Sequence, residues 1–453
     1  MPVIILVLIS AALFANTLGN SFIWDDEELI VKEPYIKNLS NIPFLFSTHY
    51  WKHFFPGSKG QYRPIRAVTL AFDYSLWHDR PRGYHLTNLI LHMLNVCIAY
   101  FIFLRLFSGK ERPDPSGSTP RGGKLFPFFG ALFFAAHPVH VESVAWIKNR
   151  SDLLASFFFL AAFLLFIRCV SRAGRKAGII EYALSLLAYG LALLSKEMAL
   201  SFPAILILFL LFLRKDLLKR YILLVLPYAF LTLSYLIAKS RLLGTLVSAE
   251  NTSGATNMYF TFLTVLKTLG YYLMLLVCPF QPNVEHKFFV PRSMGEFGVL
   301  VSLGVLIALS FVFLRSLRRS KLTAFSIAWI FVTIVPASNI IYLSGRPIAE
   351  QRLYIPSFGF CLLLSILVRR LFSENRRYVG IAAVLLVIAS YSLTVVTHNR
   401  MWKDSLTFWQ KAVGRSPHNP RAYNNLGKAY FEAGDTDKAL SLFDKSIRMD
   451  ASN

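Results

Sequence analysis

Four acidic side chains stand in a row directly after an apolar N-terminal run, namely Asp25, Asp26, Glu27 and Glu28. The first two could simply begin a short helix, where carboxylates cap backbone N–H groups and are stabilised by the helix dipole. They could also hold a general base, because partial desolvation at a membrane surface strengthens the affinity of a carboxylate for a proton. The residues alone leave both interpretations open.

Positive side chains that could stabilise a leaving phosphate lie in other short polar turns, namely Lys148, Arg150, Lys196, Arg346 and Arg352. A departing phosphate needs charge-assisted hydrogen-bond donors as its negative charge grows. Taken singly, each of these residues is better explained as a Lys or Arg whose charged end reaches the membrane interface. Only their convergence would indicate a phosphate site.

Histidines and amides form a further set. His85, Asn88, His92 and Asn95 fall within roughly an 80° arc of one helix face at about 100° per residue. Such a polar stripe must face the interior of a helix bundle, where Asn88 and Asn95 would form interhelical hydrogen bonds. His85 lies nearest the outer surface and is the better candidate for a site.

The stretch "HPVHVE" supplies His137, His140 and Glu142. Their residue types would suit zinc, but their spacing is not that of a helical HExxH site. We assign no metal ligands, and a divalent cation is left open as a cofactor.

The composition is that of a membrane protein. Of the 453 residues 55% are apolar and only 16% are charged, and the mean hydropathy is positive, which excludes an ordinary soluble domain. The net charge of +23 would suggest nucleic acid in a soluble chain. Here the positive residues gather in short loops between apolar segments, so they set membrane orientation and indicate no nucleic-acid partner.

Apolar stretches long enough to cross or nearly cross a bilayer begin near residues 2, 85, 125, 153, 180, 198, 221, 262, 297, 322, 356 and 379. Short connections rich in Lys and Arg, which the positive-inside rule places in the cytoplasm, are residues 105–124, 168–176, 214–220, 315–321 and 369–377. All five share one side only if the segment 262–278 enters and leaves on the outer face. We therefore predict about 11 spans plus a re-entrant or interfacial helix.

The remaining polar segments then all face outward, and they are residues 19–84, 137–152, 195–198, 262–292 and 344–356. This one-sidedness favours chemistry at the outer leaflet. A transporter or flippase of lipid-linked sugars, the main alternative, would scatter polar residues to the midplane and to both sides. An interaction scaffold is a weaker alternative.

Several motifs occur in order along the chain: "WDD" at 24–26, "YRPI" at 62–65, "HLTNLILH" at 85–92, "HPVHVESVA" with "NRSDLLA" up to Ala155, "SKE" at 195–197, and "AEQRLYIPS" at 349–357. In sequence and spacing they resemble the membrane glycosyltransferases of the GT-C fold. Within that fold they are most similar to the TMTC type, in which transmembrane segments precede TPR repeats. The resemblance covers almost the whole chain.

The C-terminal part agrees with this resemblance. Residues 420–453 have the length and packing positions of one TPR, including Ala422, Leu426, Gly427, Tyr430, Gly434, Ala439, Phe443 and Ile447. The preceding "DSLTFWQKAVGRSPHNP" looks like part of an incomplete repeat. We divide the chain into a GT-C-like membrane domain, residues 1–398 with an external loop at 19–84, and a TPR region, residues 399–453. Because so short a repeat region buries little surface alone, we expect it to pack on the membrane domain or on a partner protein.

The resemblance implies a reaction. TMTC-like enzymes move a sugar, typically mannose, from a polyprenyl phosphate to a Ser or Thr hydroxyl of a protein, with inversion, on the non-cytoplasmic side. The external acidic pair of the family maps onto Asp25, the expected base, with Asp26 beside it. The other matching positions would line the substrate site, and they are His85, His137, His140, Glu142, Arg150, Lys196, Glu197, Glu350, Arg352 and Tyr354.

Roles follow from residue type within this resemblance. The lipid phosphate would be held by Arg150, Lys196 and Arg352. These cations or the sugar would be oriented by Glu142, Glu197 and Glu350. The helix at 262–278 would form one wall of a groove for the prenyl chain. The short repeat region favours a prokaryotic source, and hence the plasma membrane with an external site. The sequence leaves the sugar open, and it leaves open whether the acceptor is a protein or a glycan.

Overall fold

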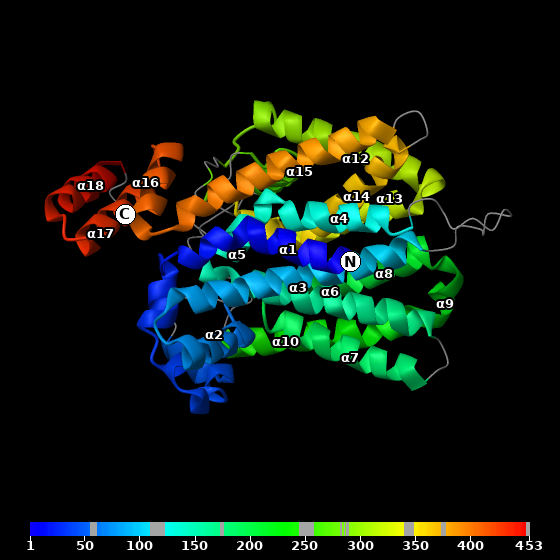
Figure 1. Ribbon diagram of the computed structural model, residues 1–453, viewed down its shortest axis with the longest axis horizontal. Helices are drawn as coiled ribbons and strands as arrows, with labels where there is room; N and C mark the ends of the chain where they lie inside the picture. The colour runs from blue at the N-terminus through cyan, green and yellow to red at the C-terminus, as the bar shows by residue number, and fades with distance from the viewer. Residues whose placement is uncertain are drawn as a thin grey trace.

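The computed structural model describes residues 1–54, 61–108, 123–172, 176–243, 258–280, 283–284, 286, 290–338, 348–372 and 377–449. Within these residues the chain is helical and contains no strand. Most long helices run along the long axis of the molecule, and three short helices pack at one end (Figure 1).

Each of the twelve apolar stretches forms a helix. They are α1 (Pro2–Phe14), α3 (Pro81–Phe107), α4 (Leu125–Ala136), α6 (Arg150–Ser171), α7 (Lys176–Leu193), α8 (Phe202–Leu213), α10 (Leu226–Leu243), α11 (Met258–Val277), α12 (Phe297–Arg319), α13 (Lys321–Ile334), α14 (Tyr354–Leu371) and α15 (Arg377–Asn399). Three further helices lie between them: α2 (Pro64–Trp77), α5 (Val141–Ala145) and α9 (Leu218–Tyr221). A helix satisfies its own backbone hydrogen bonds, as a segment that crosses a bilayer must.

Nine helices in the described part of the chain are long and apolar enough to cross a membrane. A tenth span is possible if α4 and the segment Pro138–Ala145, which meet at a bend of 48°, act together. The segments Glu197–Leu213 and Lys321–Ala337 are apolar but shorter. The chain is thus a multi-pass membrane protein, while the count of about 11 spans stays a prediction.

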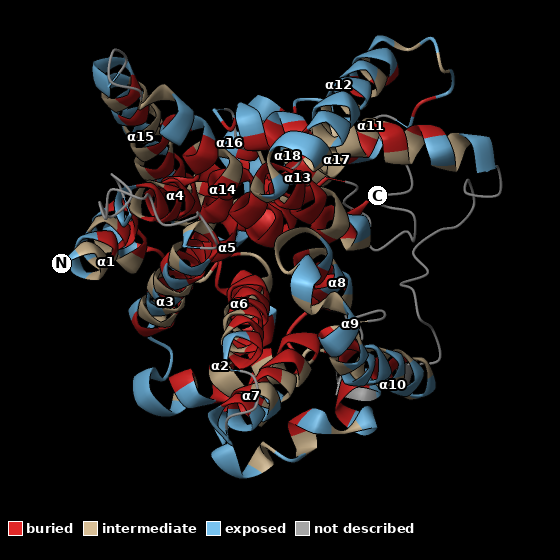
Figure 2. Cartoon of the chain, turned by 90° about the vertical axis from the view of Figure 1, so that its right-hand side faces the viewer, coloured by how far each residue is buried: buried red, intermediate tan, exposed pale blue. Residues whose placement is uncertain are grey.

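Helix α11 is long enough to cross a membrane, but it is not aligned with the bundle. Figure 2 looks along the bundle, so that α6 and α7 are seen close to end-on, whereas α11 lies across the view. A helix across the bundle axis would lie along the membrane surface. This orientation supports the prediction of an interfacial helix at 262–278.

The core surrounds α6 and α14, which are the most deeply buried of the candidate spans. Helix α6 packs against α3 and α7, and α14 packs against α13 and α4. The peripheral helices α10, α12 and α15 carry many large apolar residues that are exposed. Pale blue, which marks exposed residues, recurs along these helices in Figure 2. Helices that are apolar on all sides are expected where the surroundings are lipid.

The C-terminal helices are α16 (Ser405–Arg415), α17 (Pro420–Glu432) and α18 (Thr436–Met449). Helices α17 and α18 form a hairpin in which Gly427 allows the close approach of Phe443, because a Cβ there would lie 2.7 Å from its ring. The predicted TPR hairpin is therefore confirmed, except for residues 450–453, which lie outside the described residues. The TPR region meets the membrane domain at the buried Trp402 and through Ser21, whose N–H donates to the Lys403 carbonyl at 2.8 Å.

Candidate functional site

Asp25 forms an ion pair with Lys148 across 123 residues of sequence. The Lys148 ammonium contacts Oδ2 of Asp25, and 32% of the Asp25 side chain remains exposed. Within the described residues no donor contacts its other oxygen, Oδ1. A carboxylate fixed on one side and accessible on the other can accept a proton from a bound hydroxyl.

Asp26 lies beside it but is fully buried. Its carboxylate accepts hydrogen bonds from the backbone N–H of Lys148, at 2.8 Å, and from that of Ile23, at 3.4 Å. Burial raises the pKa of Asp26 to about 8, although these two donors favour its charged form. Asp26 thus ties the loop carrying Asp25 to the turn carrying Lys148, and it has no access to a substrate.

Glu197 gathers cations at the same end of the bundle. Its two carboxylate oxygens pair with Arg63 Nη2 at 3.1 Å and with Lys239 Nζ at 3.2 Å. Arg66 lies buried close by, and burial together with the neighbouring Arg63 lowers its pKa to about 10. The charge of Asp25 also acts on Arg66. The acidic and basic groups therefore belong to one electrostatic cluster.

Lys196 belongs to this cluster as well. Its ammonium donates to Asp152 Oδ2 at 2.5 Å, and both side chains are almost completely buried. Burial lowers the pKa of Lys196 to about 8, and Asp152 opposes that shift. Arg63 and Glu197 act on it too. We refer to Arg63, Arg66, Lys148, Lys196 and Lys239 as the cation cluster.

Arg150, by contrast, is completely buried, and each of its three guanidinium nitrogens has a partner. Its Nη2 lies 2.5 Å from Asp73 Oδ2 and 2.9 Å from the Tyr84 carbonyl, and its Nε donates to Asn88 Oδ1 at 2.8 Å. Its Nη1 donates to the Thr69 carbonyl at 3.3 Å. This guanidinium joins α2, α3 and α6, and the geometry argues against the expected contact with a lipid phosphate.

The expected histidines and Tyr354 pack inside the bundle. Tyr354 OH lies 2.7 Å from Nδ1 of His92. The Nε2 atom of His140 contacts Ser357 at 2.8 Å, and that of His137 contacts the Leu276 carbonyl at 3.1 Å. His85 is buried beside Arg150.

These contacts join helices, and their residues are closed to solvent. No group of three or more His, Cys, Asp or Glu side chains in the described parts of the chain could hold a metal ion.

The remaining expected residues form a separate group around residues 348–354. Oε2 of Glu142 accepts the Gln351 N–H at 3.3 Å. Oε1 of Glu350 accepts the Asn283 N–H at 2.7 Å and lies 2.9 Å from His286 Nε2. Arg352 donates to Tyr272 OH of α11 at 3.3 Å. These contacts fasten the segment to α5 and α11.

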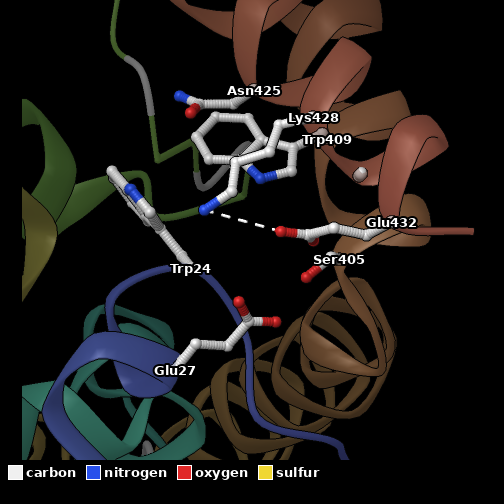
Figure 3. A pocket seen from close by; sticks show the side chains of 8 residues that line it. Trp24, Glu27, Ser405, Trp409, Asn425, Lys428 and Glu432 are labelled. Atoms are coloured by element: carbon white, nitrogen blue, oxygen red, sulfur yellow. Dashed lines mark ion pairs between the residues drawn. The ribbon is translucent and has the colours of Figure 1, made fainter. Parts of the chain in front are cut away.

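A small cleft separates Asp25's loop from the TPR region (Figure 3). Trp24 and Glu27 approach it from the loop, and α16 and α17 approach it from the other side. It encloses about 30 Å³ and is lined by Trp24, Glu27, Ser405, Trp409, Asn425, Lys428, Ala429 and Glu432. Because this volume admits only a few water molecules, the repeat region is closely docked on the membrane domain.

The structure thus brings together Asp25, Lys196 and Glu197 but keeps Arg150 and the histidines in the core. Arg346 lies outside the described residues. Sequence reasoning did not assign Arg63, Arg66, Asp152 and Lys239 to the site. Arg63 stands in the quoted motif "YRPI" and Asp152 in "NRSDLLA", so the motifs held part of the missing signal.

The fold and site define a multi-pass membrane protein with an acid–cation cluster at one end and a docked repeat. The tetratricopeptide repeat model matches residues 420–453. Over most of its length the chain is similar to proteins named protein O-mannosyl-transferase. F38B6.6 of Caenorhabditis elegans is 28% identical over 99% of this chain and 63% of the relative. Tmtc3 of Drosophila melanogaster is 27% identical over 86% and 49%, and TMTC4 of Homo sapiens is 24% identical over 95% and 64%.

These matches confirm the resemblance to the TMTC type that the motifs predict. The chain spans about half to two thirds of the length of these relatives. Among solved structures, it is similar to ArnT from Cupriavidus metallidurans bound to undecaprenyl phosphate, with a TM-score of 0.42 and 14% identity over 98% of this chain and 75% of that chain. That similarity is too low to carry an argument.

Proposed function

We propose that the chain is an inverting glycosyltransferase that acts on the non-cytoplasmic side of the membrane. It moves a sugar from a polyprenyl-phosphate-linked donor to a hydroxyl acceptor. The names of the relatives favour mannose as the sugar and a protein Ser or Thr as the acceptor. One observation carries the proposal: the accessible carboxylate of Asp25 shares an electrostatic cluster with Arg63, Arg66 and Lys196.

The chemistry requires one bond to form as another breaks. The acceptor oxygen attacks the anomeric carbon on the face opposite the phosphate, and the hydroxyl proton passes to Oδ1 of Asp25. The bond from the anomeric carbon to the phosphate oxygen breaks, and its electron pair stays on the phosphate. The products are an inverted glycoside and a polyprenyl phosphate that carries one more negative charge.

The cation cluster would receive that charge. Preorganised positive groups are most effective where charge develops in the transition state, and in a partly desolvated site they are screened little by water. Asp152 and Glu197 hold Lys196 and Arg63 in place before the donor arrives. Their carboxylates also lower the cost of burying several cations side by side.

Sugar transfer by purified protein tests the proposal. Wild-type protein in lipid nanodiscs should mannosylate a Ser/Thr peptide from a polyprenyl phosphate mannose. Asp25→Asn should lower this rate by about 10²–10⁴-fold, the usual contribution of a general base, with an unchanged melting temperature. Glu28→Gln is the matched control, because Glu28 is exposed and its one ion pair within the described residues is with Lys32 in the next turn. Full activity of Asp25→Asn would exclude Asp25 as the base.

A further inference from the structure

An apolar groove runs along the outside of the bundle between α7 and α10, which lie side by side in Figure 1. It encloses about 470 Å³, within the range of small-molecule binding sites. The exposed side chains of Leu187 and Phe230 stand on its two sides. Its full lining is Leu186, Leu187, Gly190, Leu191, Leu194, Pro227, Phe230 and Leu231.

The groove is built into the packing of the two helices. Beneath it, Tyr189 OH lies 2.6 Å from Thr232 Oγ1, and Tyr228 OH donates to Ser185 at 2.8 Å. These contacts fix α7 against α10 on the inner side. On the outer side Gly190 leaves the space open, because a Cβ at this position would meet no atom within 4 Å.

The outer end of the groove reaches the cation cluster. The carbonyl of Leu194 accepts the N–H of Ile65 at 3.4 Å, and Ile65 lies between Arg63 and Arg66 in the chain. Leu194 is also two residues before Lys196. An occupant that matches both features has a long apolar chain and an anionic group at one end.

We propose that this groove holds the part of the donor's polyprenyl chain nearest the phosphate and directs the phosphate toward Arg63 and Lys196. The inference rests on the proposed function and names where its donor binds. It also replaces the sequence-based expectation that the segment 262–278 forms a wall of the prenyl groove, because α11 contributes no residue to this groove.

Filling the groove tests the inference. Gly190→Leu adds a side chain where the structure has open space, and leucine favours a helix more than glycine does. Gly304→Leu is the matched control, because Gly304 also has no atom within 4 Å of its Cβ and lies on α12, away from the groove. Binding of a long-chain polyprenyl phosphate to each variant can be measured by native mass spectrometry, in competition with phosphatidylglycerol.

We expect Gly190→Leu to weaken polyprenyl phosphate binding at least tenfold and Gly304→Leu to leave it unchanged. The ratio of kcat/KM for a long-chain donor to kcat/KM for a short prenyl donor should also fall at least tenfold in Gly190→Leu. Unchanged binding together with an unchanged ratio would overturn the inference and leave the proposed function intact. Displacement of the polyprenyl phosphate by phosphatidylglycerol at equal concentration would have the same consequence. Binding that depends on Gly190 without any sugar transfer would reject the proposed function and leave the groove assignment standing.

Discussion

Trp24 stacks on Trp146, with ring centroids 4.6 Å apart and planes inclined by 6°. Trp24 has a backbone φ of 55°, a left-handed conformation that costs a bulky residue roughly 1–3 kcal/mol. Its ring also meets the ring of Trp409 in α16, edge to face, at 5.0 Å. The residue next to Asp25 is therefore held in a strained conformation partly by the TPR region.

Replacing Trp409 should loosen this arrangement. An aromatic pair contributes about 0.5–1.5 kcal/mol beyond its area, so Trp409→Ala should lower kcat by up to about tenfold. The KM for the donor should stay constant, because Trp409 makes its ring contacts with Trp24 and Phe408, which do not belong to the cation cluster. Steady-state assays check both values. Trp409→Phe should restore most of the rate, and Phe431→Ala, an exposed site on α17, should change nothing.

Arg150 gives a prediction about stability. Removing one partner of a buried ion pair leaves an uncompensated charge, so Arg150→Ala should lower the free energy of unfolding by about 3–5 kcal/mol. Arg150→Lys should also destabilise the protein, because lysine cannot reproduce the planar set of donors. Thermal unfolding in detergent measures both effects. A lysine variant that kept its melting temperature but raised the KM for the donor would return Arg150 to the phosphate site.

Much of the fold could be predicted from apolar length alone. Each stretch near 20 residues forms a helix because the lipid offers no other partner for backbone groups. The positive loops predict the sidedness, and hence an interfacial place for the segment 262–278. The TPR hairpin follows from its small residues, such as Gly427, at fixed positions.

The site could be predicted only in part, because tertiary contacts decide which side chains belong to it. Lys148 and Arg150 stand two residues apart in one turn, yet Lys148 meets the partly exposed Asp25 and Arg150 meets Asp73 in the core. No local pattern separates them, since the deciding partners lie far away in sequence. Lys239 lies within the C-terminal part of the apolar helix α10, and its contact with Glu197 shows that it belongs to the site.

Asp26 should give the protein a specific pH dependence. Its pKa is raised from 3.8 to about 8 by burial, so folding favours the protonated form. Its stabilising contribution is fully present below about pH 4, declines as the pH rises and is lost above about pH 8. Unfolding of wild type and Asp26→Asn across this range checks the prediction. The wild type should lose stability relative to the variant as the pH increases, and parallel curves would contradict it.

Cysteine labelling should decide the orientation of α11. Cys278, just beyond the end of this helix, is exposed, and Met258 at its beginning is 86% exposed. In a background without the other native cysteines, a membrane-impermeant maleimide should label both Cys278 and Met258→Cys from the outside, because a helix across the bundle keeps both ends on one surface. Tyr378→Cys, at the start of α15 beside the basic connection 369–377, should react only from the cytoplasmic side. If Met258→Cys reacted from the opposite side to Cys278, α11 would cross the membrane, and either the helices that follow or those that precede it would have to reverse their direction.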